Sequence, residues 1–184
     1  MSQSTWRLAQ AADDDSIADM CRHLYLEDPG PSPIPQENIH TTLVTLRRSP
    51  YRGRAVVLDV QGKVSGYALL IAFWSNEFGG DICEVDELFV IPQHRNQGHG
   101  SALFAGIVQG ELWPGAITAV ALGTTRDNAA ARRLYARLGF AEVGLAMICR
   151  IQQRVDLTAA SEASRRNLQS SPQSPNKDAN SFQT

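Results

Sequence analysis

Three acidic residues interrupt an apolar stretch near the middle of the chain. Glu84, Asp86 and Glu87 lie within residues 82–91, where all the remaining residues are apolar. The stretch is typical of a β-strand, and alternation would place Glu84 and Asp86 on one face and Glu87 on the other, with Phe89. Charges in a central strand are costly to desolvate, so these acids either border a cleft or mark a strand end that reaches solvent. A carboxylate beside a cleft can accept the proton of an amine nucleophile, directly or through water.

A basic turn that contains glycine follows this strand. Residues 90–101 read VIPQHRNQGHGS, and an amphipathic helical pattern begins behind them. A helix that begins here presents unpaired N–H groups and the positive end of its dipole to an anion. Gly98 and Gly100 lack a Cβ, which lets a phosphate approach the main chain, and Arg95 can add a charge-assisted hydrogen bond. No lysine follows these glycines, which excludes a P-loop, and Leu103 stands where a dinucleotide fingerprint needs its third glycine. The alternative to an anion-binding turn is an ordinary glycine-rich helix start.

A second helical segment carries two polar residues on one stripe. Residues 127–140 read DNAAARRLYARLGF, and Asn128 and Tyr135 lie two helical turns apart, about 10.5 Å along the axis. The small Ala131 lies between them and leaves room for a narrow ligand along the helix. An Asn near a helix start is ordinarily a cap and a helical Tyr ordinarily packs, so this segment alone favours a structural role.

Together the two motifs resemble those of the GNAT superfamily of acyl-CoA-dependent N-acetyltransferases. Residues 88–100 match its pattern hydrophobic-x-Val-x-Pro-x-x-Arg/Gln-x-x-Gly-x-Gly/Ala, and residues 128–140 match its second motif. The resemblance implies acetyl-CoA as co-substrate, its pyrophosphate bound by the main-chain amides of the turn and its pantetheine arm paired with the preceding strand. Carried over by position, the residues that bind acetyl-CoA are Leu88, Phe89, Val90, Arg95, Asn96, Gln97, Gly98, His99, Gly100, Ser101, Asn128 and Ala131.

The resemblance also implies roles for single residues. Asn128 would bond the pantetheine amides, and the Tyr135 hydroxyl would act as general acid toward the leaving thiolate. Asn96 stands where the family usually has Gly, which costs little unless this residue needs a positive φ. The general base would be an acid of the strand, whose position varies within the family. The catalytic candidates are therefore Tyr135, Glu84, Asp86 and Glu87, with Glu84 and Asp86 preferred to Glu87 as the base.

Hydrophobic periodicity predicts the elements that position these residues. Strands are expected over residues 6–10, 54–60, 63–73, 82–91 and 117–122, with one or two more within 140–151. Helices are expected after the acidic turn at 13–15 and over 35–49, 98–112 and 127–138. The fold class is α/β (an α+β mixed sheet): a GNAT-like single domain with a central, mixed, mostly antiparallel sheet of about six or seven strands and helices on both faces.

Composition sets the domain organisation. The 184 residues include 43% apolar residues and carry a net charge of −2, typical of one globular domain with its own core. We expect an N-acetyltransferase domain over 1–154 and a polar, disordered tail over 155–184.

Charge and cysteine usage limit the classes of partner. The near-neutral balance argues against nucleic acid, and no apolar run approaches the length of a membrane span. Three widely spaced cysteines are expected to be reduced thiols of a cytoplasmic protein. No metal is expected, because His94 and His99 have no acid or cysteine at metal-ligand spacing.

The predicted function is transfer of the acetyl group of acetyl-CoA to a primary amine of a small molecule or peptide, by direct attack in a ternary complex. A non-catalytic acyl-CoA-binding regulatory module is the alternative. The sequence leaves the amine and the oligomeric state open, a homodimer included. Acids and aromatics in the regions that would frame the acceptor indicate a cationic amine; they are Glu27, Asp28, Glu37, Glu77, Asp81, Trp74 and Phe78.

Overall fold

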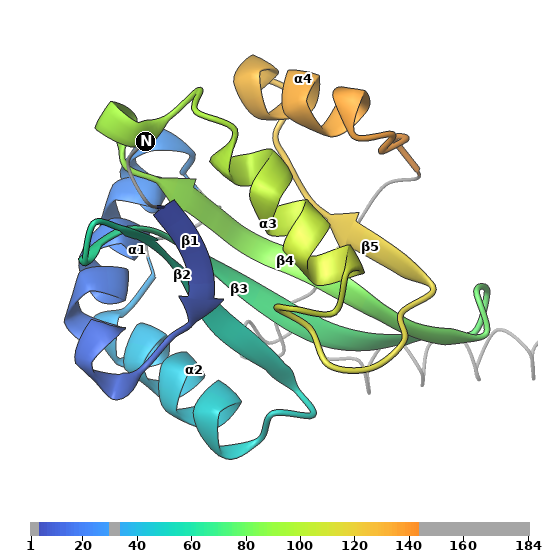
Figure 1. Cartoon of the computed structure of the whole chain (residues 1–184), viewed down its shortest axis with the longest axis horizontal. Helices are drawn as coiled ribbons and strands as arrows, with labels where there is room; N and C mark the ends of the chain where they lie inside the picture. The colour runs from blue at the N-terminus through green and yellow to red at the C-terminus, as the bar shows by residue number, and fades with distance from the viewer. Residues whose placement is uncertain (1–3, 30–33, 144–184) are drawn as a thin grey trace, which may run out of the picture. The chain divides into compact units, whose positions relative to one another are not determined.

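The computed structural model describes residues 4–29 and 34–143 (Figure 1). The chain divides into two units, residues 1–141 and 142–184, and every described helix and strand belongs to the first unit. The predicted domain boundary after residue 154 and the predicted tail lie outside the described residues, as does most of the segment 140–151, where one or two closing strands are predicted. Residues 140–143, the described part of that segment, form no strand.

The elements follow the predicted order β-α-α-β-β-β-α-β-α. The strands are β1 (Ser4–Leu8), β2 (Gly53–Val60), β3 (Lys63–Ser75), β4 (Gly80–Val90) and β5 (Ala119–Leu122). The helices are α1 (Asp14–Glu27), α2 (Gln36–Arg48), α3 (His99–Val108) and α4 (Ala129–Arg137), with 3-10 turns η1 (Ala11–Asp13) and η2 (Pro92–His94). Two helices are shorter than predicted, since α3 ends at Val108 and α4 begins only at Ala129.

The described strands form one mixed sheet in the order β1-β2-β3-β4-β5. Strands β1 to β4 are antiparallel to their neighbours, and β5 runs parallel to β4, which confirms a mixed, mostly antiparallel sheet. The β2–β3 hairpin turns at Gln61 and Gly62, whose φ angles of 56° and 80° are left-handed. The Gly62 N–H donates to Asp59 Oδ1 at 2.7 Å and closes this turn.

A buried ion pair fixes the start of α1. Asp13 is 6% exposed, and its carboxylate accepts hydrogen bonds from both terminal nitrogens of Arg7 on β1, at 2.8 and 3.0 Å. The same carboxylate accepts the Gln10 N–H at 2.7 Å. Because Arg7 neutralises it, the pKa of Asp13 lies below its ordinary value. The acidic turn predicted from sequence is thereby joined to the first strand.

Helices cover both faces of the sheet, as expected (Figure 1). Alternate residues of β3 show the two cores: Tyr67 and Leu69 pack with α1 and α2, whereas Ala68 and Leu70 pack with α3. The apolar stripes of α1 and α2 supply Ile17, Met20, Cys21, Ile39, Leu43 and Leu46 to the first core. Burying these side chains is the main stabilising term of this layer.

A β-bulge interrupts β4 at Asp86. Leu70 lies opposite Val85, but the next residue of β3, Leu69, lies opposite Glu87, so Asp86 is an extra residue in β4. The bulge reverses the alternation of side chains. Val85 packs in the core under α3, whereas Phe89 packs in the core under α1 and α2.

Strands β4 and β5 separate at the same place. Their last paired residues are Val85 and Leu122, and β4 then continues to Val90 paired with β3. On the side of β5, residues 86–90 have no strand neighbour within the part of the chain that the structure describes. The main-chain groups of this β4 edge are therefore left without ladder partners.

Candidate active site

The free edge of β4 leads into the predicted anion-binding turn. Leu88 and Val90 are half-buried and Phe89 is buried. Since these three side chains are apolar, the polar groups that this edge can offer to a ligand are main-chain N–H and C=O groups. An extended ligand with amide groups can add to such an edge as a further strand does. Binding of a pantetheine arm here stays a prediction.

The turn after β4 contains two left-handed residues. Asn96 has a φ of 60° and Gly98, the N-cap of α3, a φ of 85°. A Cβ at Gly98 would meet no heavy atom within 4 Å, so this side of the turn is open to a ligand. The first main-chain bond of α3 runs from Ala102 N to Gly98 O, and the N–H groups of the first turn, including those of Gly100 and Ser101, have no intrahelical acceptor. This geometry fits a phosphate group.

The remaining residues of the turn contact protein groups. Gln97 Nε2 donates to the Gln93 carbonyl at 3.0 Å, and His99 is 9% exposed. Burial lowers the pKa of His99, which keeps its imidazole neutral. A Cβ on Gly100 would lie 2.6 Å from Leu134 Cδ2, so this glycine also allows α3 and α4 to approach.

Arg95 binds protein groups on the strand side of the turn. Its Nε donates to the Val90 carbonyl at 2.7 Å, and its guanidinium lies 5.2 Å from the centre of the Phe89 ring. The same guanidinium bonds the Glu27 carboxylate at 2.8 and 2.9 Å. Arg95 thus holds the end of β4 against the end of α1, and its predicted phosphate contact stays a prediction.

The second motif lies on α4. Asn128 caps this helix, with Oδ1 accepting the Ala131 N–H at 3.2 Å, and its Nδ2 lies 3.4 Å from Asp28 Oδ2. The Tyr135 ring packs edge-on against Phe104, with centroids 5.9 Å apart. Burial, followed by the charge of Asp28, raises the pKa of Tyr135. The structural roles considered from sequence are thus real, and the hydroxyl remains protonated at neutral pH.

The three acids of β4 share one face, which corrects the prediction that Glu87 faces away from the other two. Glu84 lies opposite Ile71 and Glu87 opposite Leu69, and residues two apart on β3 point the same way. Asp86, the bulged residue, lines the same cavity as Glu87. Strict alternation fails because the bulge inserts one residue into β4.

Glu87 is held by three hydrogen-bond donors that sequence analysis missed. Tyr67 O–H donates to Oε2 at 2.8 Å, Tyr25 O–H donates to Oε1 at 3.1 Å, and Cys21 Sγ lies 3.7 Å from Oε2. Burial raises the pKa of Glu87 against the opposing effect of these donors, and burial also raises the pKa of Asp86. Burial also raises the pKa of Cys21 to about 11, so its thiol stays protonated at neutral pH and is not a nucleophile. The signal for the missed partners was Tyr67 itself, since a tyrosine in a central strand needs a partner for its hydroxyl.

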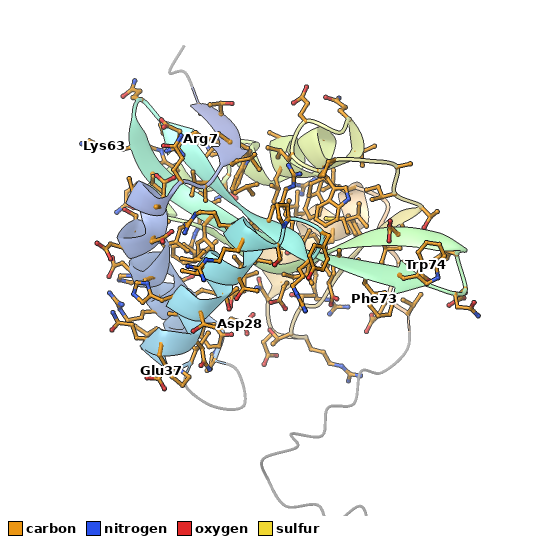
Figure 2. All side chains as sticks on the ribbon, turned by 90° about the horizontal axis from the view of Figure 1, so that it is seen from below. Arg7, Asp28, Glu37, Lys63, Phe73 and Trp74 are labelled. Carbon is orange, nitrogen blue, oxygen red and sulfur yellow. The ribbon has the colours of Figure 1, made fainter. Side chains whose placement is uncertain are left out.

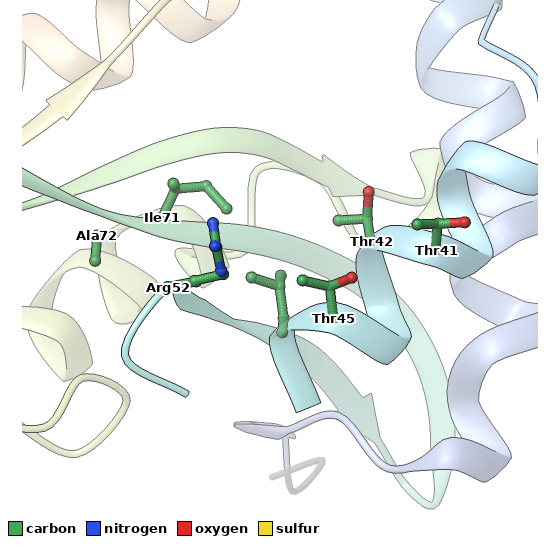
Figure 3. A pocket seen from close by; sticks show the side chains of 7 residues that line it. Thr41, Thr42, Thr45, Arg52, Ile71 and Ala72 are labelled. Atoms are coloured by element: carbon green, nitrogen blue, oxygen red, sulfur yellow. The ribbon is translucent and has the colours of Figure 1, made fainter. Parts of the chain in front are cut away.

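A cavity of about 120 Å³ lies between α1, α2 and the sheet, with both carboxylates on its wall. Its other lining residues are Ile17, Cys21, Tyr25, Ile34, Ile39, Thr42, Leu43, Tyr67 and Leu69. A wider hollow of about 320 Å³ opens beside it between α2 and β3, where Arg52 is the charged residue among the described lining (Figure 3). The acidic cavity is the better candidate for binding an amine, because its carboxylates attract a cation whereas Arg52 repels one.

Of the acids and aromatics expected to frame an acceptor, several lie apart from this cavity. Phe73 and Trp74 are 54% and 64% exposed at the far end of β3, whereas Asp28 and Glu37 lie near the ends of α1 and α2 (Figure 2). The structure therefore does not bring the predicted aromatic and acidic residues together as one set. Among the described residues, no set of three or more His, Cys, Asp or Glu side chains is placed to bind a metal ion. No described helix has the length and apolar character to span a membrane.

A family model decides the membership of the chain. The Acetyltransferase (GNAT) family model matches residues 17–140, which include both motifs and the β4 bulge. The chain belongs to the GNAT acetyltransferase family. A search among curated proteins found no match.

Solved structures agree with the GNAT fold. A possible acetyltransferase from Clostridium difficile 630 has a TM-score of 0.67 at 22% identity, over 80% of this chain and 96% of that one. The aminoglycoside N-acetyltransferase AAC(6')-Iy in complex with CoA has a TM-score of 0.66 at 16% identity, over 82% of this chain and 95% of that one. A ribosomal-protein-alanine N-acetyltransferase from Brucella melitensis biovar Abortus 2308 has a TM-score of 0.61 at 18% identity, over 81% and 100%. At these identities the likeness is one of fold, which confirms the predicted fold class.

Proposed function

We propose that this GNAT chain is an acetyl-CoA-dependent N-acetyltransferase that acetylates a primary amine in a ternary complex. One observation carries the proposal: the β4 edge from the bulge at Asp86 to Val90 has no strand neighbour among the described residues, and it leads to the open turn at Gly98. An extended thioester can lie along this edge with its phosphates at the turn, while carboxylates lie at the other end. The family and the CoA complex of one structural neighbour support this choice of acyl donor.

The residues of the turn and of β4 fit the donor by their chemistry. Asn96 and Gly98 are left-handed and exposed, and successive main-chain N–H groups in such a turn suit pyrophosphate oxygens. The β4 edge offers alternating N–H and C=O groups to the amides of a pantetheine arm. Bound acetyl-CoA would supply the thioester whose acetyl carbon the amine attacks.

The carboxylates at the bulge would accept the amine proton. Asp86 and Glu87 both line the cavity, and burial gives both a raised pKa, which brings a base closer to the operating pH. Glu84 lies opposite Ile71 and is not among the cavity residues, so it is the weaker candidate.

Two further groups complete the proposed mechanism. Main-chain N–H groups of residues 88–90 would donate to the oxygen that gains charge during attack. The Tyr135 hydroxyl keeps its proton at neutral pH and would deliver it to the departing sulfur. The aromatic contact with Phe104 holds the Tyr135 ring.

Release of CoA thiol from acetyl-CoA, with the product identified by mass spectrometry, tests the proposal. The full chain is assayed against alkylamines, polyamines, aminoglycosides and peptide N-termini, with acetyl-CoA binding followed by calorimetry. We expect amine-dependent release with stoichiometric N-acetylated product. Binding of acetyl-CoA without release on every amine would instead favour the non-catalytic acyl-CoA-binding module.

A further inference from the structure

Glu87 is a half-buried carboxylate that has no cationic partner among the residues the structure describes. The ion pairs within the described part of the chain involve neither Glu87 nor Asp86. Tyr25, Tyr67 and Cys21, which contact Glu87, are all neutral donors. Burying an ionised carboxylate is costly unless a positive charge compensates it. The site therefore lacks the positive charge that would compensate the carboxylate, and a bound cation would supply it.

The carboxylate also has room for one more donor. Its two oxygens offer about four lone-pair sites, and the two hydroxyls and one thiol can fill three of them. Tyr25 donates to one oxygen and Tyr67 to the other, so both oxygens are fixed in orientation. The bulged Asp86 adds a second acceptor on the same cavity. An ammonium group carries three N–H donors and can use both carboxylates.

Apart from the two carboxylates, Thr42 and the donors to Glu87, the cavity lining is aliphatic. Four of these aliphatic residues are Ile17, Ile39, Leu43 and Leu69. Each is less than a tenth exposed, so the wall belongs to the core of the α1 and α2 layer. The cavity volume is about 120 Å³, which is small for a ligand site. A short alkyl chain suits such a wall.

We infer that this cavity binds the acceptor as an aliphatic ammonium ion, with Glu87 as its counter-ion and with Tyr25 and Tyr67 as positioning residues. The inference rests on the proposed function and narrows its acceptor to short, unbranched aliphatic amines or to a chain that ends in one. A purely structural hydrogen-bond network around Glu87 is the competing explanation. The two differ in whether amine affinity depends on the carboxylate.

Binding without turnover tests the inference separately from catalysis. n-Butylamine, which is an ammonium ion at neutral pH, is titrated calorimetrically into the full chain in the presence and absence of CoA, which carries no acetyl group to transfer. We expect saturable binding that weakens at least about tenfold in Glu87→Gln, because a hydrogen-bonded charge is lost. Glu111→Gln is the matched control, since it removes an exposed carboxylate just beyond the end of α3. Butylammonium binding that is absent from the native chain, or equal in native and Glu87→Gln proteins, overturns the inference.

The positioning residues are tested by specificity and by coupling. Over a series of linear, branched and aromatic amines, we expect kcat/KM to favour the short linear ones. Tyr67→Phe and Tyr25→Phe should raise KM for these amines several-fold, with Tyr51→Phe, which alters an exposed ring, as control. In the Glu87→Gln background the tyrosine changes should have no further effect on amine affinity, whereas effects that persist there overturn the positioning role.

The two proposals fail in different ways. Acetyl transfer that favours bulky aromatic amines and ignores Glu87→Gln would overturn the cavity inference and leave the acetyltransferase in place. Butylammonium binding that depends on Glu87 without acetylation of any amine would overturn the enzyme and leave the cation site. Urea unfolding of each variant separates loss of binding from loss of folded protein.

Discussion

Arg95 and Glu27 form an ion pair that joins the turn after β4 to the end of α1, at 2.8 and 2.9 Å. The residue after α1, Asp28, lies 3.4 Å from the Asn128 amide at the start of α4. The end of one helix thus contacts both motifs that would hold acetyl-CoA. The same helix carries Cys21 and Tyr25 to the acidic cavity, so α1 connects the two sides of the proposed site.

Removing Arg95 should lower the free energy of unfolding by more than removing its partner Glu27. Glu27→Gln should lower the free energy of unfolding by less than about 1 kcal/mol, because both side chains are partly exposed. Arg95→Ala should cost about 1–3 kcal/mol, since it also removes the bond to the Val90 carbonyl and the contact with the Phe89 ring. Urea unfolding measures both, and equal losses would show that the contacts with β4 contribute nothing.

Asn96 tests the backbone conformation of the turn. Asn96 stands where the family usually has Gly, and its φ of 60° is the left-handed conformation in which that difference matters. Asn tolerates this region better than other non-glycine residues, so Asn96→Gly should change the free energy of unfolding by less than about 0.5 kcal/mol. Asn96→Ala should cost about 1 kcal/mol, because its Cβ is strained there. Equal stability of the Ala and Gly variants in urea would contradict a left-handed residue 96.

Much of the fold could be predicted from periodicity alone. The apolar stripes of α1 and α2, the alternation in β2 and β3 and the Gln61-Gly62 turn all report local geometry, and each lies where it was expected. The turn before α3 could be predicted for the same reason, since Pro92 and Gly98 set it locally.

The acidic site could be predicted only in part, because its geometry depends on contacts between distant segments. The bulge at Asp86 follows from how β4 pairs with β3, and no local pattern in residues 82–91 marks it. The tyrosine donors to Glu87 come from α1 and β3, 62 and 20 positions away in the chain. Arg95 was expected at a phosphate because its charge is visible in sequence, whereas its partner Glu27 lies 68 positions away.

The raised pKa of Glu87 predicts how stability depends on pH. The folded chain binds more protons than the unfolded chain between the ordinary pKa of 4.5 and the raised value. Glu87 therefore lowers stability as the pH rises through this interval, and Asp86 acts in the same direction. Compared with Glu87→Gln, the native chain should lose stability as the pH rises above about 4.5. Urea unfolding of both chains at several pH values measures this difference in the free energy of unfolding. The opposite contribution of Asp13 is present in both chains and cancels.

Parallel pH curves for the two chains would contradict a raised pKa. If native and Glu87→Gln chains lose or gain stability equally with pH, the carboxylate has the same pKa folded and unfolded.

Tyr135→Phe isolates the proposed general acid. Phe keeps the edge-on packing against Phe104 and Phe140, at centroid distances of 5.9 and 5.8 Å, so the fold and the affinity for CoA should change little. Loss of the hydroxyl should lower kcat by about 100-fold or more, the usual contribution of general acid catalysis. Steady-state kinetics with the best amine of the panel and CoA titration calorimetry measure the two quantities, with Tyr51→Phe as the matched control. An unchanged kcat removes Tyr135 as the acid, and a loss of CoA affinity equal to the loss of kcat assigns its hydroxyl to binding instead.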